Sequence, residues 1–131
     1  MNALGRHLLL ELLDCDADAI NSLEAVKGAL IEAAKRAQAT IVDVVFHEFN
    51  PFGISGVVVI AESHLSIHTW PEYRYAAVDI FSCGEVLQPE IAASYLVEQF
   101  GAARASVVEM QRGVFVNPSV PVVNKTAVAV S

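Results

Sequence analysis

The sequence is poor in cysteine, and neither cysteine lies in a pattern that binds metal or builds disulfides. Cys15 and Cys83 are the only two among 131 residues, which is too few for a disulfide framework. No C-x-x-C or H-E-x-x-H spacing occurs, and no glycine-rich phosphate loop precedes a helix. We therefore expect neither a metal centre nor a phosphate-binding loop.

Basic residues and long apolar runs are also scarce. Eight basic residues stand against fifteen acidic ones, for a formal charge of −7, whereas a nucleic-acid partner would demand a basic stripe. The acidic balance suits a cationic small molecule, but simple solubility is the more ordinary explanation. No run approaches the roughly 20 apolar residues of a membrane span. The first residues, MNALGRHLLLELL, lack a signal-peptide pattern, so we expect a cytoplasmic protein without nucleic-acid or membrane partners.

What is abundant is apolar side chains. Hydrophobic residues make up 54% of the chain and charged residues 18%, enough for a real core in a single domain of residues 1–131. The apolar surplus favours a large subunit interface, because obligate homodimer interfaces resemble a domain core cut in half. We expect an oligomer, in the simplest case a homodimer.

Residue patterns predict an alternation of strands and two helices. Helices are expected at 16–39, rich in alanine, and at 89–101, with Pro89 in the first turn and Gly101 as C-cap. Strands are expected at 5–15, 40–49, 57–61, 64–70, 75–83 and 105–113, with a turn at 50–56 and a tail at 114–131 that wraps a surface or stays loose.

Short connections between these strands predict the fold class. The expectation is an α+β two-layer sandwich, with a largely antiparallel sheet and both helices on one face. The other sheet face would then be apolar and uncovered. A second copy of the sheet would cover it.

Reactive residue types are concentrated in AESHLSIHTWPEYRYAAVDIFSCG, residues 61–84. Taken singly, each has an ordinary explanation. Ser63 lacks the G-x-S-x-G setting of a hydrolase and could cap a turn. His68 could be a half-buried, hydrogen-bonded histidine, and Cys83 a small core residue.

Taken together, the run resembles a known family. ESHLSIHTWPEY and YAAVDIFSCG, together with LGRHLLLELLDCD, GISGVVVIAES and VEMQRG, resemble the small bacterial and archaeal S-adenosylmethionine decarboxylases over about residues 4–113. These are proenzymes that cut themselves to make a pyruvoyl cofactor.

The resemblance implies self-cleavage between Glu62 and Ser63, giving a β chain of residues 1–62 and an α chain of residues 63–131. Ser63 would attack the carbonyl of Glu62 and become the pyruvoyl group. The residue matching His68 is the family's proton acceptor in processing, and the one matching Ser55 assists it by hydrogen bonding.

The resemblance also implies the later chemistry. The pyruvoyl cofactor forms a Schiff base with the amine of S-adenosylmethionine and acts as an electron sink during decarboxylation, which makes the aminopropyl donor of spermidine synthesis. Cys83 matches the proton donor, Phe49 the aromatic that stacks on adenine, and Glu72 the carboxylate that holds the ribose.

Strand geometry adds a constraint that does not depend on the family. Ser63 and His68 are five positions apart, so on one continuous strand they face opposite sides, about 16 Å apart. Either the chain bends sharply near His64, or a second subunit delivers His68. The family's homodimers fit the second option.

One residue departs from the family pattern. Arg74 stands where this family typically has glycine. If it points outward the change is neutral; if it points inward it could pair with Glu72 or bind a substrate carboxylate. This leaves open a pyruvoyl-dependent ornithine or arginine decarboxylase on the same scaffold.

A regulatory subunit without activity would be expected to lose Ser63, His68 or Cys83, and all three are present.

Overall fold

Six strands and two helices follow one another in the predicted order in the computed structural model, which describes residues 3–114 and residue 128. The tail expected beyond Val114 therefore lies, except for Val128, outside the described residues. The strands are Ala3–Leu13 (β1), Thr40–Glu48 (β2), Ile54–Ala61 (β3), Ser63–Trp70 (β4), Tyr75–Cys83 (β5) and Arg104–Val114 (β6), and the helices are Leu23–Arg36 (α1) and Pro89–Gln99 (α2).

Several boundaries differ from the sequence-based expectation, the start of the first helix most of all. The first helix begins at Leu23 rather than residue 16, because Ser22 is extended and its Oγ accepts the Ala25 amide at 3.2 Å as an N-cap. Residues Ala19–Asn21 form a short 3-10 helix (η1) instead. The third strand begins at Ile54, so the predicted turn at 50–56 is shorter than expected.

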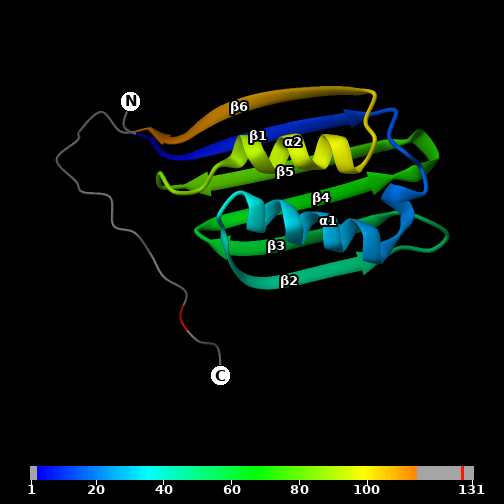
Figure 1. The fold of residues 1–131 in the computed structure, drawn as a ribbon, viewed down its shortest axis with the longest axis horizontal. Helices are drawn as coiled ribbons and strands as arrows, with labels where there is room; N and C mark the ends of the chain where they lie inside the picture. The colour runs from blue at the N-terminus through cyan, green and yellow to red at the C-terminus, as the bar shows by residue number, and fades with distance from the viewer. Residues whose placement is uncertain (1–2, 115–127, 129–131) are drawn as a thin grey trace.

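All six strands belong to one sheet in the order β2-β3-β4-β5-β1-β6, and every neighbouring pair is antiparallel. The first strand is thus inserted between β5 and the last strand (Figure 1). Both helices lie against the same face of the sheet, and their apolar sides meet it in one continuous core. The predicted two-layer α+β fold is confirmed.

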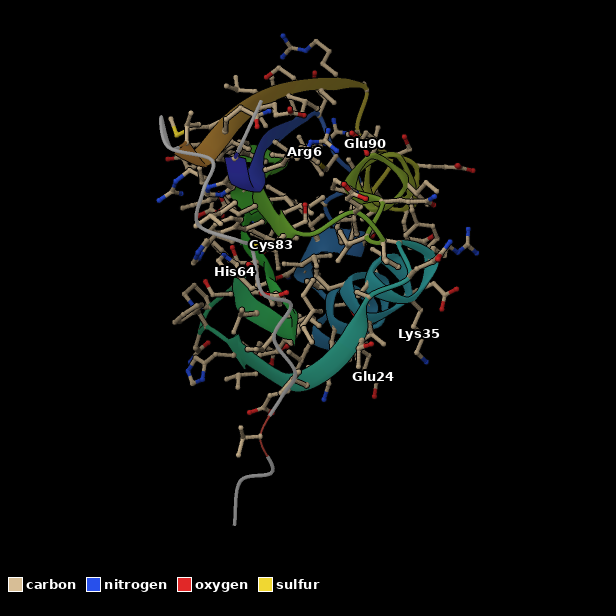
Figure 2. The ribbon with its side chains drawn as sticks, turned by 90° about the vertical axis from the view of Figure 1, so that its left-hand side faces the viewer. Arg6, Glu24, Lys35, His64, Cys83 and Glu90 are labelled. Atoms are coloured by element: carbon tan, nitrogen blue, oxygen red, sulfur yellow. The ribbon has the colours of Figure 1, made fainter. Side chains whose placement is uncertain are left out.

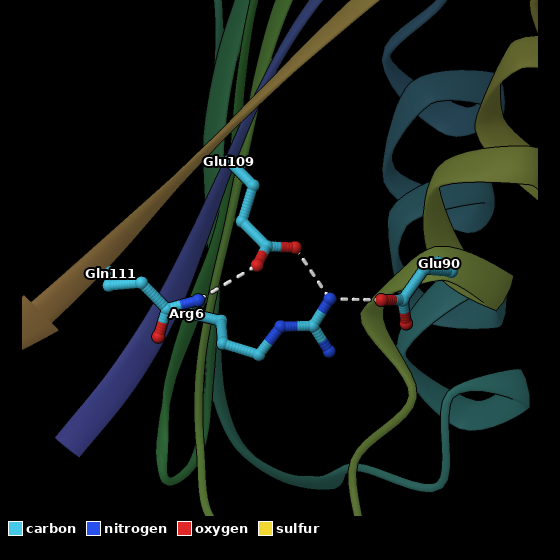
Figure 3. Close-up of polar contacts among 4 residues, drawn as sticks. All are labelled: Arg6, Glu90, Glu109 and Gln111. Carbon is cyan, nitrogen blue, oxygen red and sulfur yellow. Dashed lines mark hydrogen bonds and ion pairs between the residues drawn. The ribbon is translucent and has the colours of Figure 1, made fainter. Parts of the chain in front are cut away.

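An ion-pair network fastens the second helix to the edge of the sheet (Figure 3). Arg6 on β1 donates to Glu90 at the start of α2 and, at 2.6 Å, to Glu109 on β6. Gln111 donates to the other oxygen of Glu109 at 3.0 Å. The hydrogen bond from Arg6 lowers the pKa of the Glu90 carboxyl, and the positive charge of Arg6 lowers it further, which keeps this carboxylate ionised at neutral pH.

The opposite face of the sheet, the open face, is covered by no described element of this chain (Figure 2). Along β1 and β5 the side chains alternate between buried ones that point to the helices and more exposed ones that lie on the open face. Leu9, Val59 and Met110 keep 37–53% of their surface exposed.

Among the described residues, no helix has the length and apolar character to cross a membrane.

Candidate active site

The reactive stretch forms two neighbouring strands, and their register brings Ser63 and Cys83 together. Ser63 opens β4 and pairs with Ser82 near the end of β5. As a result the Ser63 hydroxyl lies 3.3 Å from the Cys83 sulfur, and both side chains are half-buried. Ser63 also has a backbone φ of +99°. A residue with a Cβ rarely adopts this conformation, which stores strain of the order of 1–3 kcal/mol.

Glycine on the neighbouring strand leaves room for the thiol. Gly5 of β1 pairs with Cys83, and a Cβ at Gly5 would lie 3.1 Å from the Cys83 sulfur and 2.4 Å from the Phe81 ring. Any larger residue at position 5 would therefore push Phe81 or Cys83 out of place.

A second group forms where β3 and β4 pair at the other end of β4. Ser55 and His68 are register partners, and the Ser55 hydroxyl lies 2.8 Å from His68 Nδ1. They border a hollow of about 250 Å³. Its lining residues come from two turns and the strands beside them: Phe49, Phe52, Gly53, Ser55, His68, Thr69, Trp70 and Glu72. The structure thus brings together four of the predicted site residues, Phe49, Ser55, His68 and Glu72.

The two groups remain apart within one chain. β4 is continuous from Ser63 to Trp70, so the chain does not bend near His64. Five residues of strand separate Ser63 from His68 by about 16 Å. One chain therefore presents the Ser63–Cys83 pair and the His68 hollow as two separate half-sites.

Arg74 points away from the hollow. Its Nε donates to the carbonyl of Cys15 at 2.7 Å, and its Nη2 lies 3.5 Å from the carbonyl of Asp14. The guanidinium adopts the outward orientation, in which it does not pair with Glu72. Arg74 therefore gives no structural support to the ornithine or arginine decarboxylase alternative, which depended on an inward-pointing arginine.

A polar network on the open face was not predicted from the sequence. His7 Nε2 lies 3.0 Å from Asp79 Oδ1, and Arg112 Nη1 lies 3.0 Å from His7 Nδ1. Ser66 donates to the other oxygen of Asp79 at 3.2 Å. Phe81 stacks on the His7 ring with centroids 5.2 Å apart. No local signal could reveal these contacts, because they depend on the pairing of β1 with strands that follow much later.

His64, next to Ser63, is a further histidine of this face (Figure 2). Its ring packs edge-on against Phe81 at 5.9 Å and His7 at 6.5 Å. Burial lowers the pKa of His64, the nearby His7 lowers it further, and Asp79 acts in the opposite direction. The alternation of His64, Ser66 and His68 along β4 is a signal that could have placed them on one face.

In the part of the chain that the structure describes, no three His, Cys, Asp or Glu side chains are grouped to hold a metal ion. Ser63, Cys83 and His68 offer a hydroxyl, a thiol and an imidazole for chemistry at the two sites.

Comparison with known proteins gives one consistent result. Residues 6–113 match the family model for S-adenosylmethionine decarboxylase. A relative from Thermodesulfovibrio yellowstonii named S-adenosylmethionine decarboxylase proenzyme is 63% identical over 87% of this chain and 84% of its own. One of the same name from Acidithiobacillus ferrooxidans is 51% identical over 86% and 85%. The crystal structure of the adenosylmethionine decarboxylase from Aquifex aeolicus matches with a TM-score of 0.85 at 36% identity, covering 92% of this chain and 100% of that one.

Proposed function

Since the chain belongs to the S-adenosylmethionine decarboxylase family, we propose that it cleaves itself at Glu62–Ser63 and then decarboxylates S-adenosylmethionine with a pyruvoyl group made from Ser63. The observation that carries the proposal is the contact of 3.3 Å between the Ser63 hydroxyl and the Cys83 thiol, at a residue whose φ of +99° strains the backbone.

Self-cleavage requires a hydroxyl on the residue after the broken bond. The Ser63 Oγ attacks the carbonyl carbon of Glu62, and the peptide C–N bond breaks as an ester forms. A base then takes the Ser63 Cα proton, and the Cβ–O bond breaks to release Glu62 with a free carboxylate. The dehydroalanine that remains tautomerises, and water displaces ammonia to leave the pyruvoyl group. Serine supplies the β-oxygen that this sequence of steps needs.

The pyruvoyl group supplies an electron sink for the loss of CO2. Cys83 donates the proton that the product carbon then needs, and the contact of its sulfur with Ser63 supports this role. His68 is the base of the processing step, and its hydrogen bond to Ser55 orients the ring.

The hollow beside His68 binds the nucleoside part of the substrate. Phe49 is 48% exposed there and can stack on adenine. Glu72 is exposed at the same hollow and can accept hydrogen bonds from the ribose hydroxyls. The sulfonium cation of the substrate suits the net charge of −7.

A complete site then needs two chains, because one chain keeps the two half-sites about 16 Å apart. We propose a homodimer formed through the open face, in which His68 of one protomer serves Ser63 of its partner. The product would be the aminopropyl donor of spermidine synthesis in the cytoplasm.

Intact mass under denaturing conditions tests the proposal. Samples are incubated separately with S-adenosylmethionine, ornithine and arginine, each with cyanoborohydride to trap an amine adduct. We expect two fragments that break at Glu62/Ser63, with an adduct on the 63–131 fragment only for S-adenosylmethionine. An adduct with ornithine or arginine would reassign the substrate. A single uncut chain without an adduct would overturn the proposal in favour of a regulatory subunit.

A further inference from the structure

We propose that residues 14–21, here called the brace, hold the two turns that carry Phe49 and Glu72 at a set separation, with Asn21 and Arg74 as positioning residues for substrate binding. The inference rests on the proposed function, since it takes the hollow beside His68 as the site of the substrate. The brace itself does not line this hollow; it acts through the turns.

The first turn, residues 49–53, is hydrogen-bonded to the brace through Asn21. The Gly53 amide donates to Asn21 Oδ1 at 3.1 Å, and the Phe49 amide in turn donates to the Gly53 carbonyl at 2.8 Å. Gly53 has a φ of +106°, and a Cβ there would approach the Thr69 carbonyl to 3.3 Å. Another residue at position 53 would be strained, so the contact with Asn21 holds a turn that already has one preferred shape.

The second turn, formed by the short 3-10 helix Pro71–Tyr73 (η2) and Arg74, is fastened to the other end of the brace. The Cys15 amide donates to the Arg74 carbonyl at 2.9 Å, and the Arg74 side chain returns a bond of 2.7 Å to the Cys15 carbonyl. Arg74 itself has a φ of +53°, a region that costs a side-chain-bearing residue about 1 kcal/mol or more. The two-way bonding with Cys15 offsets that cost.

The brace is anchored independently of the turns. Cys15 and Ile20 are fully buried in the core. The Asp16 amide donates to the Phe100 carbonyl at 2.9 Å, and the Asp16 carboxylate accepts the Asp18 amide at 3.0 Å just before η1. A segment held to the core at several points can set the distance between the two turns that it fastens.

The hollow lies between these turns, so their separation determines how Phe49 and Glu72 meet a ligand. Loosening either turn would weaken the stacking and the hydroxyl contacts without touching the Ser63–Cys83 pair. A small misplacement of binding groups is costly. The expected signature is therefore a higher KM with self-cleavage and kcat preserved.

Paired variants test the brace. Asn21→Leu removes the acceptor at nearly constant size, whereas Asn21→Asp keeps an oxygen in its place and should restore binding. For Asn21→Leu we expect KM for S-adenosylmethionine to rise about tenfold with kcat within about twofold. Arg74→Gly removes the side-chain hydrogen bonds but keeps the main-chain hydrogen bond to Cys15, so we expect KM to rise about threefold. Arg36→Lys, on the exposed side of α1, is the matched control.

Two readouts do not depend on turnover. Trp70 is the only tryptophan and lines the hollow, so its fluorescence reports ligand binding in a Ser63→Ala background. Hydrogen exchange of the Gly53 amide should be faster in Asn21→Leu than in the wild type and slow again in Asn21→Asp.

The outcomes separate the two proposals. If the wild type is active and Asn21→Leu keeps its KM, the brace is overturned and the proposed function stands. If the wild type neither cleaves nor decarboxylates, the proposed function fails. The brace proposal is then tested by the exchange rate of the Gly53 amide and by ligand binding measured with Trp70 fluorescence. If Asn21→Leu changes neither, the brace proposal is overturned as well. Equal KM increases in Asn21→Leu and Asn21→Asp would also contradict it.

Discussion

Ser63 lies 3.3 Å from Cys83 on the neighbouring strand, at the opposite end of β4 from His68. The hydroxyl and thiol therefore form one half-site, and the His68 imidazole, hydrogen-bonded to Ser55 at 2.8 Å, belongs to another. The proposed chemistry needs both halves, and a second protomer is the simplest way to join them.

Subunit mixing tests this arrangement. Ser63→Ala chains retain His68, and His68→Ala chains retain Ser63, so neither should cleave alone. After unfolding and refolding together, we expect partial cleavage of the His68→Ala chains, measured by intact mass. A chain that carries both substitutions is the control and should rescue nothing. Absence of cleavage in the first mixture, with mixed dimers shown to form, would count against delivery across the interface.

Glycine at position 5 should be essential to the Ser63–Cys83 half-site. In Gly5→Ala the new Cβ would approach the Phe81 ring to 2.4 Å and the Cys83 sulfur to 3.1 Å, so these side chains must move. We expect a loss of about 1–3 kcal/mol in unfolding free energy, together with a decarboxylation rate reduced by at least about tenfold, because a displaced proton donor is a poor one. Activity assays and urea denaturation measure the two effects.

Gly28→Ala is the matched control for Gly5→Ala. A Cβ at Gly28 on α1 meets nothing within 4 Å, and alanine favours a helix over glycine by about 1 kcal/mol. This variant should be more stable than the wild type and equally active. Wild-type activity in Gly5→Ala would show that the thiol does not need the room that glycine leaves.

The Arg6 network should stabilise the fold only above acidic pH. The arginine holds the pKa of Glu90 below its ordinary value of 4.5, so its contribution is present above that value and is lost as the pH falls through the lowered pKa. Because Glu90 is largely exposed, we expect Arg6→Gln to cost about 1 kcal/mol or less at pH 7. Denaturation at pH 7 and pH 3 should show this difference shrinking; a difference independent of pH would point to packing of the arginine instead.

Acidification should also act through His64. Burial holds its pKa below the ordinary 6.5, so the unfolded chain binds the proton first as the pH falls. The stability from burying the neutral ring is present above about pH 6.5 and is lost below it. The free energy of unfolding should therefore fall more steeply from pH 7.5 to pH 5.5 in the wild type than in His64→Gln. Parallel slopes in the two proteins would contradict a half-buried neutral imidazole at His64.

Several features of the fold and the site were predictable from sequence because they are local. Strand and helix order followed from residue periodicity, and both the β4 and β5 ranges were predicted within a residue of their observed bounds. The start of α1 was wrong by seven residues, because Ser22 is extended and caps the helix at that point. The candidate reactive residues were recognisable because the stretch that holds Ser63, His68 and Cys83 resembles a known family.

Tertiary structure decided which residues become neighbours through strand pairing. The sequence alone determined that Ser63 and His68 cannot meet on one strand, since the rise of an extended chain is the same everywhere. Only the register of β4 against β5 placed Ser63 beside Cys83, and only the pairing of β1 with β5 and β6 assembled His7, Asp79 and Arg112. The direction of Arg74 was likewise open until the loop after β1 supplied two carbonyl acceptors. Such contacts join residues far apart in the chain, so their geometry exists only once the sheet has formed.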